Sequence, residues 1–127
     1  MATKASILVV DDDVSLCKTM SLILKHKSYA VATANDGREA IERVQQTPFD
    51  MIFLDIKMPH IDGVESYRRI KAIRPDAVVM MMTAYAVEDL AQQALEEGAS
   101  GILYKPLHID RVIAIIEKRP SRAAKGR

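Results

Sequence analysis

Residues 6–13 read Ser-Ile-Leu-Val-Val-Asp-Asp-Asp, an apolar run that ends abruptly in three carboxylates. A short apolar run bounded by polar residues is typical of a strand buried on both faces. From Leu16 to Leu24 the apolar side chains recur at helical spacing, so a helix is expected to follow the strand directly. The stretch therefore predicts one strand–helix unit with acidic side chains at the junction.

The same unit recurs four more times along the chain. Each later apolar run is also followed by a helical pattern, and turn-forming or helix-breaking residues separate the segments. Because the strands are continuously apolar and alternate with helices, we expect an α/β domain with a parallel sheet and right-handed crossovers. The predicted strands are residues 6–10, 29–34, 51–54, 77–82 and 101–104.

Composition and charge narrow the class of protein. The 127 residues suit one domain, and 49% hydrophobic with 28% charged residues is ordinary globular usage. The single cysteine, Cys17, excludes an internal disulfide and favours a reducing compartment. No apolar run is long enough for a membrane span or a signal peptide, so we expect a cytoplasmic protein without a membrane partner.

The charge is unevenly distributed. The chain carries +1 overall, but the last ten residues hold five basic side chains and no acidic one. The remaining residues contain 13 basic against 17 acidic side chains, a net charge of −4. We therefore expect one domain over residues 1–118 that does not bind nucleic acid directly, followed by a basic linker or disordered tail over 119–127.

Polar side chains stand where the predicted strands end. Asp11, Asp12 and Asp13 follow the first strand, Asp55 the third, Thr83 the fourth and Lys105 the fifth. In an open parallel sheet, ligands bind beyond the carboxyl ends of the strands. Clustered carboxylates favour a hard cation such as Mg²⁺, and a carboxylate can attack phosphorus to give an acyl phosphate. A lysine, a hydroxyl and Mg²⁺ stabilise the transferred group, so the set fits phosphoryl transfer to a carboxylate.

Taken singly, each of these residues has a simpler explanation. Asp12 or Asp13 can cap the first helix, Thr83 can end a strand, and Lys105 can lie in solvent. The three histidines show no metal-ligand spacing and are expected on the surface or in loops. Only the joint placement at successive strand ends favours a site.

Four segments strengthen this interpretation. They are Ile7 to Asp13, Phe53 to Gly63, Met82-Thr83-Ala84, and Gly98 to Gly101 followed by Tyr104-Lys105-Pro106. In order and spacing, over residues from about 5 to 118, they resemble the response-regulator receiver domain of two-component signalling. The resemblance implies a flavodoxin-like doubly wound (βα)5 sandwich whose parallel sheet has the order 2-1-3-4-5.

The resemblance also implies roles for single residues. Asp55 is the expected phosphoacceptor. The domain is expected to be a signalling domain and not an enzyme, one that catalyses only its own phosphorylation and dephosphorylation. Mg²⁺ is expected at Asp12 and Asp55, at the backbone carbonyl of Lys57 and, through water, at Asp11. The phosphoryl oxygens are expected to meet Thr83, the Ala84 amide and Lys105, with a cis bond before Pro106. Lys57 and Tyr85 are expected to border the approach of water to the phosphoryl group.

One position departs from the family pattern. The family often has an aromatic residue three positions before the lysine, where this chain has Ile102. Tyr104 is aromatic and is expected on the same face of the strand as Ile102, opposite Leu103. Thr83 is present, so a conformational switch on phosphorylation is expected. The sequence does not supply, at position 102, the aromatic side chain that moves together with the threonine in the family.

The implied partners are a sensor histidine kinase or phosphotransfer protein and an output domain or downstream effector. A phosphorylation-dependent homodimer through the fourth helix, fifth strand and fifth helix is also implied. Two alternatives stay open. One is a small phosphatase similar to the haloacid dehalogenases, with Asp11 as nucleophile in an Asp-x-Asp motif. The other is a receiver-like interaction module that never takes phosphate.

Overall fold

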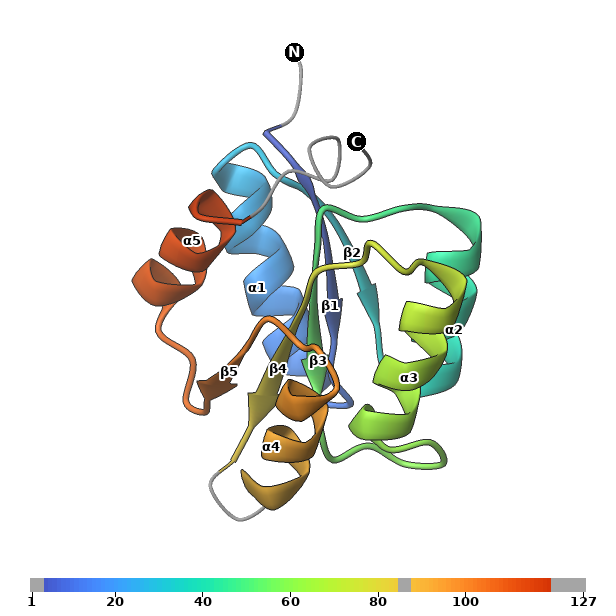
Figure 1. Ribbon diagram of the computed structural model, residues 1–127. Helices are drawn as coiled ribbons and strands as arrows, with labels where there is room; N and C mark the ends of the chain where they lie inside the picture. Colours follow the sequence, from blue (N-terminus) through green and yellow to red (C-terminus); the bar gives the residue numbers. More distant parts are fainter. Residues whose placement is uncertain (1–3, 85–87, 120–127) are drawn as a thin grey trace.

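The computed structural model describes residues 4–84 and 88–119, and strands alternate with helices throughout (Figure 1). All neighbouring strands run parallel, in the order β2-β1-β3-β4-β5, which confirms the expected flavodoxin-like α/β fold. The strands are β1 (Ser6–Val10), β2 (Ala30–Ala34), β3 (Met51–Asp55), β4 (Val79–Thr83) and β5 (Gly101–Tyr104). The helices are α1 (Val14–His26), α2 (Gly37–Gln46), α3 (Gly63–Ile73), α4 (Glu88–Glu96) and α5 (Ile109–Glu117).

Helices cover both faces of the sheet and enclose two apolar layers. On one face, α1 and α5 bury side chains such as Leu24 and Ile116 against the strands. On the other face, α2, α3 and α4 do the same with side chains such as Val44, Tyr67 and Ala94. The apolar periodicity in the sequence marks these inward faces because each helix has only one side in contact with the sheet.

Burial of the strands differs between the centre and the edge of the sheet. Every residue of β3 and β4 is buried. In β2, by contrast, the four residues from Ala30 to Thr33 are only partly buried. Three of the four residues of β5, Gly101, Ile102 and Tyr104, are also only partly buried. The expectation that all strands are buried on both faces is therefore wrong for β2 and β5, because they are the two edge strands and each has a neighbour on one side only.

Three aspartates begin helices at the carboxyl edge of the sheet. The side chains of Asp13, Asp36 and Asp62 accept hydrogen bonds from backbone amides in the first turns of α1, α2 and α3. This satisfies amide groups that lack a partner within the helix and fixes where each helix starts. Of the two aspartates that could cap the first helix, Asp13 does so.

The loop after β3 turns back sharply on the strand. The Gly63 amide donates to the Ile56 carbonyl at 2.7 Å. A Cβ at Gly63 would collide with the Asp55 carbonyl and the Ile56 Cα, so only glycine permits this close approach. No helix within residues 4–84 and 88–119 has the length and apolar character needed to cross a membrane.

Candidate functional site

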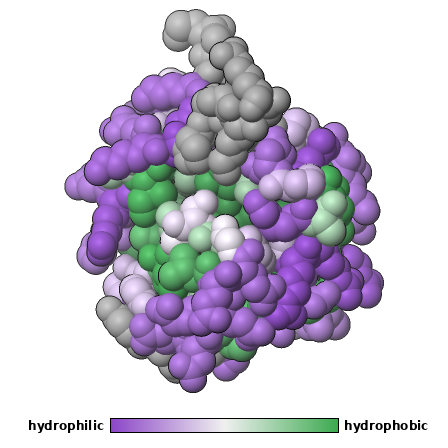
Figure 2. Space-filling model, in the orientation of Figure 1, coloured by the Kyte–Doolittle hydropathy of each residue, from purple (hydrophilic) through white to green (hydrophobic). Residues whose placement is uncertain are grey.

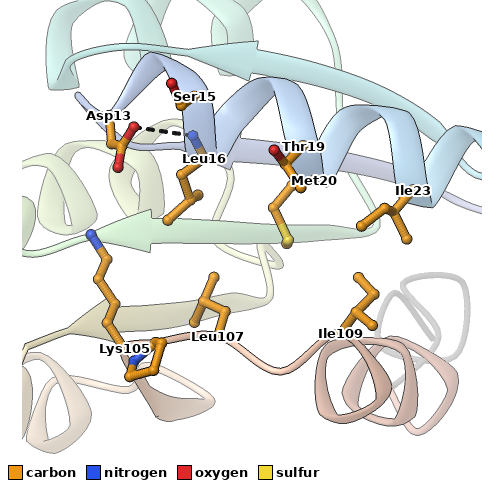
Figure 3. A pocket seen from close by; sticks show the side chains of 10 residues that line it. Asp13, Ser15, Leu16, Thr19, Met20, Ile23, Lys105, Leu107 and Ile109 are labelled. Carbon is orange, nitrogen blue, oxygen red and sulfur yellow. Dashed lines mark hydrogen bonds between the residues drawn. The ribbon is translucent and has the colours of Figure 1, made fainter.

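The carboxyl edge of the sheet brings together the polar residues that the sequence singles out. Asp11 follows β1, Asp55 ends β3, Thr83 ends β4 and Lys105 follows β5. Because these four strands are consecutive in the sheet, the residues at their ends lie side by side. Asp13 takes no part in this group, since it caps α1 through a hydrogen bond from the Leu16 amide (Figure 3).

Three carboxylates form the acidic centre of the site. One oxygen from each of Asp11, Asp12 and Asp55 lies within 4.8 Å of the others. Asp11 is fully buried and Asp55 is 4% exposed, whereas Asp12 faces solvent. Like charges this close and this poorly solvated repel one another, and a hard cation with oxygen ligands relieves the repulsion.

Lys105 lies between the two buried carboxylates. Its Nζ is 2.7 Å from Asp11 Oδ2 and 3.3 Å from Asp55 Oδ1. Burial alone would lower the pKa of Lys105, but the hydrogen bond to Asp11 and the charge of Asp55 outweigh it and raise that pKa. The lysine is therefore held as a cation at the bottom of the acidic centre. The peptide bond between Lys105 and Pro106 is cis.

Asp55 is less acidic than an ordinary aspartate. Burial, followed by the negative charge of Asp11, raises its pKa to about 6, and the charge of Lys105 opposes part of this rise. At neutral pH the side chain is still mostly a carboxylate. It is thus a poorly solvated anion that gains from a nearby positive charge and has the electron pair needed to attack an electrophile.

Two side chains that the sequence analysis did not assign to the site hold Asp11 in place. The Asn35 Nδ2 donates to the Asp11 carbonyl at 3.1 Å, and the Cys17 thiol approaches the same oxygen at 3.3 Å. Burial, with the charge of Asp11, raises the pKa of Cys17 to about 11, so its sulfur stays protonated and can donate. The only signal for Asn35 is its position at the end of the strand beside β1.

An open cavity of about 580 Å³ borders Asp12, Asp55, Ala84 and Lys105. Lys57 is exposed on its rim, and Met58 and Pro59 complete the wall. The cavity therefore gives a group the size of phosphate access to Asp55 from solvent. Tyr85, which was expected to border this approach, lies outside the described residues.

Thr83 ends β4, and the neighbouring strand β5 carries Ile102 and Tyr104, the two positions considered for the family's aromatic residue. Thr83 is buried, and its Oγ1 donates to the Ala84 carbonyl at 2.7 Å. Ile102 packs on the face covered by α2, α3 and α4, and Leu103 on the opposite face, as expected. Tyr104 pairs in register with Thr83, and its hydroxyl lies 2.7 Å from Glu88 Oε1 at the start of α4.

A second hollow lies on the other side of Lys105. Figure 3 shows an apolar groove between α1 and the segment that leads from β5 into α5. Its volume is about 440 Å³, and Leu16, Met20, Leu107 and Ile109 contribute to its walls. Lys105 lines both this groove and the cavity beside Asp55.

Comparisons with known proteins agree with this geometry. The sequence profile of the response regulator receiver domain matches residues 7–117. The transcriptional regulatory protein ZraR of Escherichia coli (strain K12) is 43% identical over 112 residues, which make up 88% of this chain and 25% of ZraR. The chemotaxis protein CheY of Listeria monocytogenes is 34% identical over 113 residues, 88% of this chain and 95% of CheY. The chain thus spans about a quarter of ZraR and nearly all of CheY.

Two solved structures have the same fold. The receiver domain of NtrX from Brucella abortus superposes with a TM-score of 0.82 at 30% identity, covering 88% of this chain and 95% of that one. A response regulator from Burkholderia pseudomallei, solved with a phosphorylated aspartic acid, a calcium ion and citrate, superposes with a TM-score of 0.81 at 27% identity. That match covers 89% of this chain and 66% of the other.

Proposed function

Because this chain belongs to the response regulator receiver domain family, we propose that it takes a phosphoryl group onto Asp55 from the phosphohistidine of a sensor kinase or phosphotransfer protein. The observation that carries the proposal is the position of Asp55, buried beside Asp11 and Lys105 at the edge of an accessible cavity. The phosphorylated domain then controls an output domain or a separate effector. This agrees with the match to ZraR, which covers only 25% of that regulatory protein.

The transfer itself uses the Asp55 carboxylate. One carboxylate oxygen forms a bond to phosphorus while the bond between phosphorus and the donor's imidazole nitrogen breaks. The imidazole leaves with that electron pair and takes up a proton from solvent. A pKa of about 6 leaves Asp55 mostly ionised at neutral pH, and its weak solvation favours attack.

The donor set fits Mg²⁺. Asp11, Asp12 and Asp55 offer only oxygen ligands within 4.8 Å of one another, and their mutual repulsion contributes to the raised pKa of Asp55. Together with the Lys57 carbonyl, these residues would hold the ion, which when bound neutralises charge on the phosphoryl oxygens. The Burkholderia response regulator, which holds a calcium ion and a phosphorylated aspartic acid, supports the same chemistry here.

Three groups of the chain are suited to bind the attached phosphoryl group. Lys105 already lies 3.3 Å from Asp55 Oδ1 and can pair with a phosphoryl oxygen. The Ala84 amide can donate to another. The Thr83 hydroxyl now donates to the Ala84 carbonyl, so it must rotate to reach the phosphoryl group. That rotation couples the chemical event at Asp55 to the end of β4.

The output surface proposed is the face made by α4, β5 and α5. Figure 2 shows apolar side chains gathered between the helices labelled α5 and α4 in Figure 1, with hydrophilic residues around them. On α4, Leu90 and Leu95 are 36% and 38% exposed. An apolar area of this kind suits a protein partner, including a second phosphorylated copy of the domain. The cytoplasm is the compartment that suits this function.

The phosphatase alternative is disfavoured by the geometry. Its motif requires both Asp11 and Asp13 at the reacting centre, but Asp13 caps α1, and Asp55 joins Asp11 instead.

Intact-mass measurement after incubation with a small acyl phosphate and Mg²⁺ tests the proposal. One added phosphate is expected on the wild type and on Asp13→Asn, and none on Asp55→Asn. Full labelling of Asp55→Asn would refute the acceptor assignment. Turnover of a phosphomonoester without labelling would favour the phosphatase, and neither labelling nor turnover would favour a module that takes no phosphate.

A further inference from the structure

The carboxyl end of α4 is fastened to α3, its neighbour on the same face of the sheet (Figure 1). Arg68 binds the carboxylate of Glu97 with two nitrogens of its guanidinium, Nε at 2.8 Å from Oε1 and Nη2 at 2.7 Å from Oε2. A paired contact of this kind fixes orientation as well as distance. The hydroxyl of Tyr67 donates to the Glu97 carbonyl at 3.0 Å. Both the side chain and the backbone of Glu97 are therefore held from α3.

The turn that follows α4 packs against the same tyrosine. Gly98 turns the chain with a φ of 110°, a conformation that favours glycine at the end of a helix. The Tyr67 hydroxyl lies 3.0 Å from the place that a Cβ of Gly98 would occupy, so the turn is in direct contact with α3. The Ser100 amide then donates to the Val79 carbonyl, which joins the turn to β4. The carboxyl end of α4 is thus attached to both α3 and the sheet.

Helix α3 is a rigid support for this attachment. Tyr67 and Ile70 are buried on its inner face, and burial raises the pKa of Tyr67, so that its hydroxyl stays protonated and can donate. At the start of α3 the Gly63 amide donates to the Ile56 carbonyl, directly after the strand that ends in the phosphoacceptor. The helix is therefore held in place relative to that strand at its first turn and along its inner face.

The amino end of α4 is held more weakly than its carboxyl end. Within Glu88–Glu96 the buried side chains are those of Ala91 and Ala94, which offer only one methyl group each to the sheet. The Tyr104 hydroxyl donates to Glu88 Oε1 at 2.7 Å, in a contact that is exposed to solvent. Small buried areas and exposed hydrogen bonds leave a segment with low local stability. Resistance to movement therefore falls from the carboxyl end of α4 to its amino end.

We propose that Glu97, held by Arg68 and Tyr67, is the pivot about which α4 turns when Asp55 is phosphorylated. The amino end of the helix moves, and the carboxyl end stays with α3. This inference rests on the proposed function and adds to it the direction of the movement. A fixed point at one end lets a small change beside Asp55 rotate the helix as a unit without unfolding it.

The amino end of α4 is also the end on which the proposed switch acts. Thr83 pairs in register with Tyr104, and Tyr104 is bonded to Glu88 at the start of the helix. At about 1.5 Å per residue, Glu88 is about 13 Å from the pivot, so a rotation of about 10° displaces it by about 2 Å. Leu90 therefore moves farther than Leu95, and the change that a partner of the output face meets is greatest at Leu90.

Distances between two spin labels on the full chain measure this movement. One label is placed at Asp89→Cys or Glu96→Cys, near the two ends of α4, and the other at Leu22→Cys on α1 or Gln46→Cys on α2, so that two directions are covered. The native Cys17 is buried and has a pKa of about 11, so its thiol does not take the label. After addition of a small acyl phosphate and Mg²⁺, we expect residue 89 to move by about 2 Å and residue 96 by less than about 1 Å.

The double variant Tyr67→Phe, Arg68→Ala removes the pivot. It keeps the buried ring of Tyr67 and changes a side chain at residue 68 that is 43% exposed, so the fold is expected to persist. In this variant residue 96 should move as far as residue 89 on phosphorylation. Arg69→Ala is the matched control, because Arg69 binds Glu65 of its own helix, and it should behave as wild type.

Measurements without phosphate separate this proposal from the proposed function. In the unphosphorylated wild type the distance distribution to residue 96 should be narrower than that to residue 89, and in the double variant the two should be equally broad. Intact mass reports separately whether Asp55 is phosphorylated, and if it is not, the unphosphorylated distributions alone decide whether the pivot exists. Equal movement of residues 89 and 96 in the phosphorylated wild type would overturn the proposal, as would an unchanged distribution at residue 96 in the double variant.

Discussion

Lys105 Nζ lies closer to Asp11 than to the proposed phosphoacceptor, at 2.7 Å from Asp11 Oδ2 against 3.3 Å from Asp55 Oδ1. Asp11 is fully buried, so in the metal-free protein Lys105 supplies most of the charge that offsets this carboxylate. Asp55 shares the same cation and keeps a raised pKa. The lysine thus serves the stability of the acidic centre as well as the proposed chemistry.

Replacing Lys105 is expected to destabilise the metal-free protein. In Lys105→Met the buried Asp11 loses its cation, and breaking a pair of this kind costs about 2–4 kcal/mol of unfolding free energy. The pKa of Asp55 should also rise above about 6, because the opposing positive charge is gone. Urea unfolding and NMR titration of the Asp55 carboxyl measure both effects. The exposed Lys57→Met is the control, and equal behaviour of the two variants would contradict the assignment.

The stability of the metal-free protein should depend on the titration of Asp55. Burial first, and the charge of Asp11 second, raise its pKa from 3.8 to about 6, so the folded state binds this proton more tightly than the unfolded state. The contribution of Asp55 is therefore greatest below pH 3.8 and is lost as the pH rises through about 6. The loss is on the order of 1–3 kcal/mol.

The difference in unfolding free energy between wild type and Asp55→Asn separates the contribution of Asp55 from those of the other carboxylates. Unfolding free energies measured at several pH values should show the variant gaining relative to wild type as the pH rises from about 4 to 7. Added Mg²⁺ should reduce that gain. A difference that does not change with pH would show that Asp55 has an ordinary pKa.

Asn35 is expected to support metal binding without contacting the ion. Its amide fixes the Asp11 carbonyl, and side chains that orient metal ligands often change affinity by about tenfold or more. Asn35→Ala and Asn35→Asp both remove the donor and should weaken Mg²⁺ binding to a similar extent. Calorimetric titration measures the affinity, with the exposed Gln46→Ala as control. Unchanged Mg²⁺ affinity in both Asn35 variants would show that the backbone after β1 keeps its position without the hydrogen bond from Asn35.

The sequence predicts the alternation of strands and helices and the residues at the strand ends. Periodicity does not show which strands are neighbours, and the order 2-1-3-4-5, which brings Asp11, Asp55 and Lys105 together, came from the family resemblance. The partial exposure of the edge strands β2 and β5 was missed because a strand's position at a sheet edge is a property of that order. Asn35 was missed because it acts on a backbone carbonyl of another strand, and backbone acceptors leave no mark in the sequence.

Tyr104 is expected to tie β5 to the start of α4. In Tyr104→Phe the hydrogen bond to Glu88 is lost, which should lower the local stability of α4 by about 0.5–1.5 kcal/mol. Hydrogen exchange of the amides in residues 88–96 measures this, and Glu96→Ala at the other end of the helix is the control. Because Tyr104 pairs with Thr83, phosphorylation should also shift the NMR signals of Tyr104 and Glu88. Shifts confined to the loop after Asp55 would show that this connection does not transmit the signal.

The phosphorylated domain is expected to keep its phosphate for a long time. Hydrolysis needs a water in line with the bond between Asp55 and phosphorus, and the protein's main contribution is to position that water. Lys57 is exposed on the rim of the cavity, and its alkyl stem can cover one side of the phosphoryl group. Tyr85, two residues after Thr83 in the sequence, is expected from the family resemblance to border the other side, and neither residue has a carboxylate or amide to orient water.

Loss of phosphate is followed in wild type, Tyr85→Ala and the Lys57→Asn, Tyr85→Glu double variant, without kinase or phosphatase. Both variants should lose phosphate faster, the first because solvent gains access. The double variant should be the faster of the two, because its new side chains can also hold a water. The exposed Lys18→Asn, on the far side of α1, should match wild type. Equal rates in all four proteins would show that access at residues 57 and 85 does not control the lifetime.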